Sequence, residues 1–186
     1  MDIVISDISH LHVAKDISSG IDQSAKVRGT GIARRSAEYI AEKIKNGNSI
    51  IALENNEFAG FCYIEKWEHG KYVAHSGLIV KPKFRGQGLA KKIKKKIFKL
   101  SKKKFPGVKI FGITTAQAVM KINYELGYKP VHFSKLTNDP DFWSGCQTCK
   151  NFDVLTRTER KLCLCTGMLY DPEEKKFNKS KAAKFI

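Results

Sequence analysis

Short apolar segments alternate with polar turns in the first half of the chain. Strand-like segments rich in β-branched and aromatic residues cover residues 49–53, 58–67 and 72–80. The turn-forming pairs Asn55-Asn56 and His69-Gly70 separate these segments. Such pairs are typical of tight connections between neighbouring antiparallel strands. The pattern therefore predicts an antiparallel meander of three strands.

Helical spacing dominates the region before the meander. After a short predicted strand at residues 2–5, residues 8–46 are expected to be mostly helical, with a break at Gly29-Thr30-Gly31. The clearest helix extends from Arg34 to Asn46, because its apolar residues recur on one face and Gly47 supplies a stop signal. Helices are therefore expected to pack against the meander.

The second half of the chain predicts alternating helices and strands. A lysine-rich amphipathic helix follows residue 88 and ends at Pro106-Gly107. Its apolar face consists of Leu89, Ile93, Ile97 and Leu100. A strand over residues 108–114, a helix over 116–126 and a strand over 128–133 are predicted next.

The segment between the third meander strand and the lysine-rich helix carries the clearest chemical signal. An apolar strand ends at Val80, and the sequence Arg85-Gly86-Gln87-Gly88-Leu89-Ala90 opens the helix. The first amide groups of a helix lack partners within the helix, and the helix dipole adds positive charge there. Glycines let the backbone approach an anion closely. This turn is therefore predicted to bind a phosphate or pyrophosphate group.

Three known phosphate-binding patterns can be compared with this turn. A Walker A loop requires a hydroxyl residue after its lysine, and none follows Lys91-Lys92. The dinucleotide pattern Gly-x-Gly-x-x-Gly fails because Lys91 occupies the third glycine position. Arg85, Gly88 and Ala90 satisfy Arg/Gln-x-x-Gly-x-Gly/Ala, the pyrophosphate motif of the GNAT superfamily of N-acetyltransferases. The sequence therefore resembles that superfamily.

The resemblance covers about residues 1–136 and implies the acetyltransferase fold, an α/β (α+β) architecture with a mixed, mostly antiparallel sheet flanked by helices. The order of predicted elements and the pair Gly127-Tyr128 also resemble the family. In that family the strand before the motif and the following strand separate, and acetyl-CoA or another acyl-CoA lies in the opening. The implied cofactor-binding residues are Leu78, Ile79, Val80, Arg85, Gly86, Gln87, Gly88, Leu89 and Ala90.

Direct transfer of an acyl group to an amine needs a base for the amine proton and benefits from an acid for the departing thiolate. In many family members the acid is a tyrosine four residues before the glycine that ends the last core helix. Asn123 holds that position here, and Tyr124 is its neighbour. Candidate bases are His75, which titrates near neutrality when unperturbed, and Glu65. Cys62 is interpreted as a small buried hydrophobe.

Residues 137–186 form a Cys-rich extension and basic tail, expected to pack on the first domain. Cys146 and Cys149 form a Cys-x-x-Cys pair, and Cys163 and Cys165 follow as Cys-x-Cys. Four thiolates could hold a structural zinc ion. However, Cys-x-Cys on an extended strand would point its sulfurs to opposite faces. Structural zinc, reduced buried thiols and a disulfide or redox pair therefore remain alternatives.

Composition places these motifs in a globular protein. The 186 residues include 42% apolar and 28% charged residues, and no segment approaches the roughly 20 continuous apolar residues of a membrane span. A cytoplasmic protein is expected, since the sequence begins without a secretory signal. The net charge of +16 fits a solubilising lysine-rich surface and equally an attraction for anions such as nucleic acid, coenzyme A or an acidic substrate, so charge alone does not decide the function.

The segment from Phe142 to Pro172 resembles a bacterial subgroup of these acyltransferases linked to arginine biosynthesis. That resemblance implies a small-molecule amine acceptor, with an amino acid such as glutamate as the expected example. A zinc-ribbon nucleic-acid binder, with Phe142, Trp143 and Phe152 stacking on bases, is the alternative from another class. An acetyltransferase fold that binds acyl-CoA without catalysis is the third alternative. The sequence does not decide whether the chain forms a homodimer.

Overall fold

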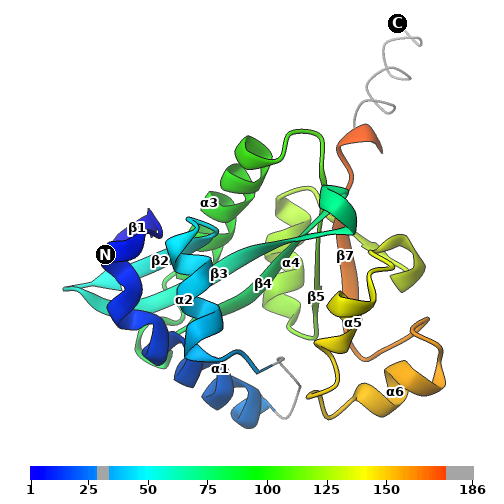
Figure 1. Cartoon of the computed structure of the whole chain (residues 1–186), viewed down its shortest axis with the longest axis horizontal. Coiled ribbons are helices and arrows are strands. Elements are labelled where there is room, and N and C mark those ends of the chain that lie inside the picture. Colours follow the sequence, from blue (N-terminus) through cyan, green and yellow to red (C-terminus); the bar gives the residue numbers. More distant parts are fainter. Residues whose placement is uncertain (29–33, 175–186) are drawn as a thin grey trace, which may run out of the picture.

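The computed structural model describes residues 1–28 and 34–174 (Figure 1). Seven strands form one sheet in the order β1-β2-β3-β4-β5-β7-β6. Among the described strands, only β4 and β5 pair in parallel, and the other neighbours are antiparallel. The strands are β1 (Asp2–Ile5), β2 (Ser49–Glu54), β3 (Glu57–Trp67), β4 (Tyr72–Val80), β5 (Lys109–Thr114), β6 (Lys129–Val131) and β7 (Thr166–Tyr170). The predicted meander and the mixed α/β class are confirmed.

Helices cover both faces of this sheet (Figure 1). Helices α1 (Ala14–Arg28) and α2 (Ala37–Lys45) pack on one face through the cluster that contains Ile17, Ile40 and Phe61. Helices α3 (Leu89–Lys104) and α4 (Gln117–Glu125) pack on the other face. Short 3-10 turns occupy Ile8–Val13, Glu68–Gly70, Pro82–Phe84 and Phe133–Lys135. The break expected at Gly29-Thr30-Gly31 lies outside the described residues.

The extension contributes to the same sheet. Its helices α5 (Pro140–Ser144) and α6 (Phe152–Arg157) pack beside β5 and β7, and β7 lies between β5 and β6. Trp143 anchors this region, because its side chain is buried and its Nε1–H donates to the Thr137 carbonyl over 2.8 Å. One sheet therefore includes strands from both sides of residue 136.

The aromatic residues of the extension are part of this packing. Trp143 is buried, and Phe142 and Phe152 pack against the cluster around it. Phe142 also contacts Phe111 of β5, with ring centroids 4.9 Å apart. These rings therefore serve the core rather than an exposed base-stacking surface.

Among the described helices, none combines the length and the apolar character that a membrane crossing requires.

Candidate functional site

The strands β4 and β5 separate partway along their length. Their parallel pairing joins Tyr72–Ala74 to Lys109–Phe111 and stops there, although β4 continues to Val80. Beyond this point β5 pairs only with β7. The separation that the family resemblance implied is therefore present.

A bulge accompanies this separation. The register between β3 and β4 shifts near Gly77, which has a φ of 62°. A Cβ at this position would lie 2.5 Å from the Tyr63 ring. Glycine is therefore required here, both for the left-handed backbone and for the close approach of that ring. The bulge redirects β4 as it leaves β5.

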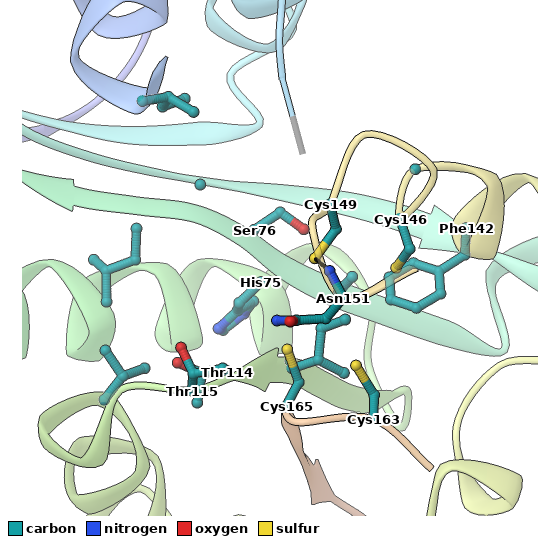
Figure 2. Close-up of a pocket in the computed structure, with 18 of the residues that line it drawn as sticks. His75, Ser76, Thr114, Thr115, Phe142, Cys146, Cys149, Asn151, Cys163 and Cys165 are labelled. Carbon is teal, nitrogen blue, oxygen red and sulfur yellow. Dashed lines mark hydrogen bonds between the residues drawn. The ribbon is translucent and has the colours of Figure 1, made fainter. Parts of the chain in front are cut away.

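A cleft occupies the opening between the two strands (Figure 2). Strand β4 contributes residues 74–78, and the segment from Gly112 to Thr115 forms the facing wall. Lys94 from α3 and Asn123 from α4 line the cleft on the α3 side of the sheet, and Arg35 lines it from the segment before α2. The extension contributes a further wall that includes all four of its cysteines.

The turn before α3 has the geometry of an anion site. Gly86 and Gly88 have φ angles of 78° and 71°, and a Cβ at either position would meet no protein atom within 4 Å. Within the described residues, the backbone N–H groups from Gly86 to Ala90 have no acceptor. The turn is held in place because Arg85 Nε donates to the Val80 carbonyl over 3.0 Å. These open, unpaired amides at the N-terminus of a 16-residue helix fit a phosphate group.

The two residues considered for the acid differ sharply in position. The Asn123 side chain is 2% exposed and lines the cleft, and its Oδ1 is buried without a hydrogen-bond partner. A buried carbonyl oxygen of this kind is costly unless a ligand supplies a donor. Tyr124 is 70% exposed and is not among the residues that line the cleft. One step along a helix turns a side chain by about 100°, which accounts for the difference.

His75 lies in a buried polar cluster beneath the cleft. Its Nε2 is 2.9 Å from Ser101 Oγ, and its Nδ1 is 3.1 Å from Lys94 Nζ and 3.0 Å from the Tyr128 hydroxyl. Burial, together with the Lys94 charge, lowers the pKa of His75 well below its usual value. The imidazole is therefore neutral at physiological pH. Its Nδ1 accepts hydrogen bonds from its neighbours instead of being free to take a proton.

Lys94 is a site residue that the sequence reasoning missed. Its side chain is 2% exposed, and no carboxylate lies within ion-pair distance of it in the described parts of the chain. Burial lowers the pKa of this lysine to about 8. The sequence does carry a signal, because Lys94 sits four residues before Phe98 and seven before Ser101, on the buried side of the helix. Among so many exposed lysines that signal is easily overlooked.

Glu65 lies on the opposite face of the sheet from His75. The Tyr39 hydroxyl donates to its Oε1, and Lys43 Nζ is 3.3 Å from the same oxygen. Burial raises the pKa of Glu65 to about 7, although the Arg35 charge and a hydrogen bond from Ser76 act in the opposite direction. Glu65 itself does not line the cleft, but Tyr63 and Ser76 on the same face do.

Arg35 brings a positive charge to this side of the cleft. Its Nε donates to the Tyr63 hydroxyl over 2.7 Å, and its Nη1 donates to the Arg34 carbonyl over 3.0 Å. No carboxylate lies within ion-pair distance of Arg35 among the described residues, although the Arg35 charge helps to hold down the pKa of Glu65. The guanidinium therefore retains donors for an anionic ligand.

The structure does not support the zinc interpretation of the cysteines. Figure 2 shows Cys146 and Cys149 on one loop and Cys163 and Cys165 on the segment that leads to β7, with their sulfurs at the cleft wall. No group of three or more metal-ligating side chains in the described residues could hold a metal ion. All four are free thiols, and burial raises the pKa of Cys146 to about 11 and that of Cys165 to about 12.

The cysteines instead form part of the packing. Cys149 Sγ accepts a hydrogen bond from the Asn151 amide over 3.4 Å, and Cys146, Cys163 and Cys165 pack against the cluster that contains Trp143. Cys62 is likewise buried, and its pKa is raised to about 11 by burial. Burial and packing at these positions agree with the interpretation of the cysteines as buried, reduced thiols.

Comparisons with known proteins agree with this geometry. The model of the acetyltransferase (GNAT) family matches residues 30–121, about half of the chain, including the turn before α3. No curated protein matches the sequence significantly.

Many solved structures resemble the fold, and three of them serve as examples. N-acetylglutamate synthase from Neisseria gonorrhoeae, complexed with coenzyme A and N-acetyl-glutamate, aligns over 91% of this chain with a TM-score of 0.64 and 13% identity. The chain spans only 34% of that synthase. A Mycobacterium tuberculosis protein in complex with CoA has a TM-score of 0.65 and 12% identity over 92% of this chain and 99% of its own. The protein yncA from Salmonella typhimurium, with acetyl-CoA, has a TM-score of 0.60 and 14% identity over 92% and 93%.

Proposed function

Because the chain belongs to the GNAT acetyltransferase family, we propose that it transfers an acyl group from acyl-CoA directly to the amine of a small carboxylate-bearing molecule, such as an amino acid. Acyl transfer from coenzyme A is the activity of this family. The acceptor class and the roles of individual residues are the parts that we infer from the cleft.

The observation that carries the proposal is the continuity between the turn and the cleft. The amides from Gly86 to Ala90 are open and unpaired, and β4 leads from Val80 back to His75 at the cleft. An extended strand of that length measures about 17 Å. The pyrophosphate would lie on the turn, and the pantetheine arm would follow the unpaired edge of β4 through Leu78 to the cleft. The unpaired Asn123 Oδ1 offers an acceptor for a substrate N–H group.

Glu65 is the better of the two candidate bases. The low pKa and occupied Nδ1 of His75 argue against proton abstraction by its imidazole. Burial raises the pKa of Glu65 to about 7, which suits a base at neutral pH. Since Glu65 lies behind Tyr63 and Ser76, we infer that a water molecule relays the amine proton to it.

Arg35 supports an acceptor that carries a carboxylate. Its guanidinium lines the cleft with no carboxylate at ion-pair distance in the described chain, and guanidinium groups bind carboxylates through paired hydrogen bonds. The net charge of +16 would also attract an acidic acceptor. The structurally similar synthase from Neisseria gonorrhoeae is complexed with N-acetyl-glutamate. Glutamate is therefore the first acceptor to test.

The test measures release of free thiol from acetyl-CoA with glutamate, with lysine-rich peptides and with polyamines. The proposal predicts the highest kcat/KM for the amino acid, and Arg35→Met should raise KM for it by at least about tenfold. Arg34→Met is the matched control, because Arg34 is exposed and does not line the cleft. Preference for polyamines, or an equal effect of the two substitutions, would contradict the proposed acceptor class.

A further inference from the structure

The buried ammonium of Lys94 lacks an anionic partner. Its Nζ contacts His75 Nδ1 at 3.1 Å and lies 5.3 Å from the centre of the Tyr128 ring. No acidic side chain pairs with it in the described parts of the protein. A cation that is removed from water without a counter-ion is costly for the folded state. The arrangement therefore suits an anion that reaches Lys94 only during the reaction.

Lys94 also lies where such an anion would form. It follows Gly88 by six residues, which places it about 9 Å along the axis of α3 from the anion-binding turn. It lines the cleft together with Asn123 and the β4 residues 74–78. These residues surround the end of the path along β4. The reacting end of an acyl-CoA that follows this path would therefore approach Lys94.

We propose that Lys94 is the acid of acyl transfer, stabilising the departing CoA thiolate and then protonating it. This inference rests on the function proposed above. The neutral amine forms a bond to the thioester carbonyl carbon, and the carbon–sulfur bond breaks with its electron pair on sulfur. The Lys94 ammonium gives one proton to that sulfur, producing the CoA thiol. Lys94 regains a proton from solvent after the thiol leaves, and the base releases the amine proton to solvent.

The other polar groups near the cleft are less suited to this role. Asn123 has no acidic proton, and Tyr124 is exposed away from the cleft. The groups that face Lys94 are Cys62 of β3, His75 of β4 and Tyr128 after α4. Burial raises the pKa of Cys62 and of Tyr128 and lowers the pKa of His75, so all three side chains are uncharged at neutral pH. The pKa of about 8 for Lys94 is close to the roughly 8.5 of an ordinary alkyl thiol, so proton transfer between them is nearly balanced.

The experiment titrates the thiol of CoA bound to an excess of protein, by ultraviolet absorbance of the thiolate. In the wild type the thiol pKa should be about 1 unit lower than in free CoA, which keeps it close to the pKa of Lys94, and in Lys94→Met this shift should disappear. Turnover of acetyl-CoA should fall about 10²- to 10⁴-fold in Lys94→Met. The matched control is Lys99→Met, an exposed lysine on the same helix, which should behave as the wild type.

Two further measurements separate proton donation by Lys94 from the effect of its charge and from a general loss of CoA binding. Lys94→Arg keeps a charge but donates its proton poorly, so it should keep the lowered thiol pKa while losing turnover. Desulfo-CoA should bind wild type and Lys94→Met equally, because it lacks the sulfur. Equal thiol pKa values in wild type and Lys94→Met, with CoA bound to both, would overturn the role of Lys94 alone. Absence of CoA binding to the wild type would overturn the proposed function as well.

Discussion

Replacement of Lys94 by methionine should stabilise the folded protein while it impairs the reaction. Burial lowers the pKa of Lys94 from its ordinary value of 10.5 to about 8. Each pKa unit corresponds to about 1.4 kcal/mol, so the buried ammonium costs about 3 kcal/mol at neutral pH. Loss of the hydrogen bond to His75 offsets about 1 kcal/mol of that gain. We expect Lys94→Met to raise the free energy of unfolding by about 2 kcal/mol at pH 7.

The pH dependence of this difference gives a sharper test. Below pH 8 Lys94 is protonated in both the folded and unfolded states, and its full cost is present. Between pH 8 and 10.5 the unfolded state binds more protons, so this residue makes wild-type stability rise with pH. The advantage of Lys94→Met should therefore shrink as the pH increases through this range.

Urea unfolding at pH 7 and near pH 10 measures both effects, with Lys99→Met as the control for loss of a surface charge. A Lys94→Met variant that is less stable than the wild type at pH 7, with a difference that does not change with pH, would refute the reasoning. That result would mean that the folded protein does not hold an unpaired ammonium at this position.

Three other substitutions test separate parts of the site and fold. Glu65→Gln should lower turnover about 100-fold and remove the rise in kcat/KM that the wild type shows through pH 7, since the base works only when deprotonated; an unchanged pH profile would exclude Glu65. Asn123→Leu should weaken acetyl-CoA binding about 5- to 10-fold in calorimetry without loss of stability, because the Oδ1 has no partner within the protein; unchanged binding would leave Asn123 without a ligand contact. Trp143→Ala should lower the free energy of unfolding by about 3–5 kcal/mol in urea, in a single transition, because the extension shares the sheet; a separate transition would contradict a shared core.

Local sequence patterns were sufficient to predict much of the fold. The meander strands were predicted nearly to their ends, because the turn pairs Asn55-Asn56 and His69-Gly70 mark them. The lysine-rich helix was also predicted, with its start within the sequence from Arg85 to Ala90 and its end at Pro106-Gly107, and the structure places it at Leu89–Lys104. By contrast, the strand at Thr166–Tyr170 was not predicted. Its position between β5 and β6 depends on pairing with residues about 35 to 60 positions away, which local periodicity does not record.

The part of the site formed by backbone groups could be predicted from the sequence. The side chains whose pKa depends on burial could not. The turn from Arg85 to Ala90 could be recognised because glycine spacing and a helix start define an anion site directly. The pKa of His75 could not be anticipated, since it depends on burial beside Lys94 and Tyr128. The cysteine spacing suggested zinc, yet spacing alone does not fix where the sulfurs point in an irregular segment. Lys94 was hidden by the many lysines around it.

The most direct test of the account is calorimetric binding of acetyl-CoA to the wild type, Gly88→Glu and Gly107→Glu. Both glycines have a left-handed backbone, with φ angles of 71° and 77°, and both face open space, so the two substitutions carry a similar folding cost of roughly 1–2 kcal/mol. Only Gly88 lies on the predicted pyrophosphate site. We predict that the wild type and Gly107→Glu bind acetyl-CoA and that Gly88→Glu loses at least about 100-fold in affinity. Equal binding by all three proteins, or no binding by the wild type, would contradict the assignment of the turn.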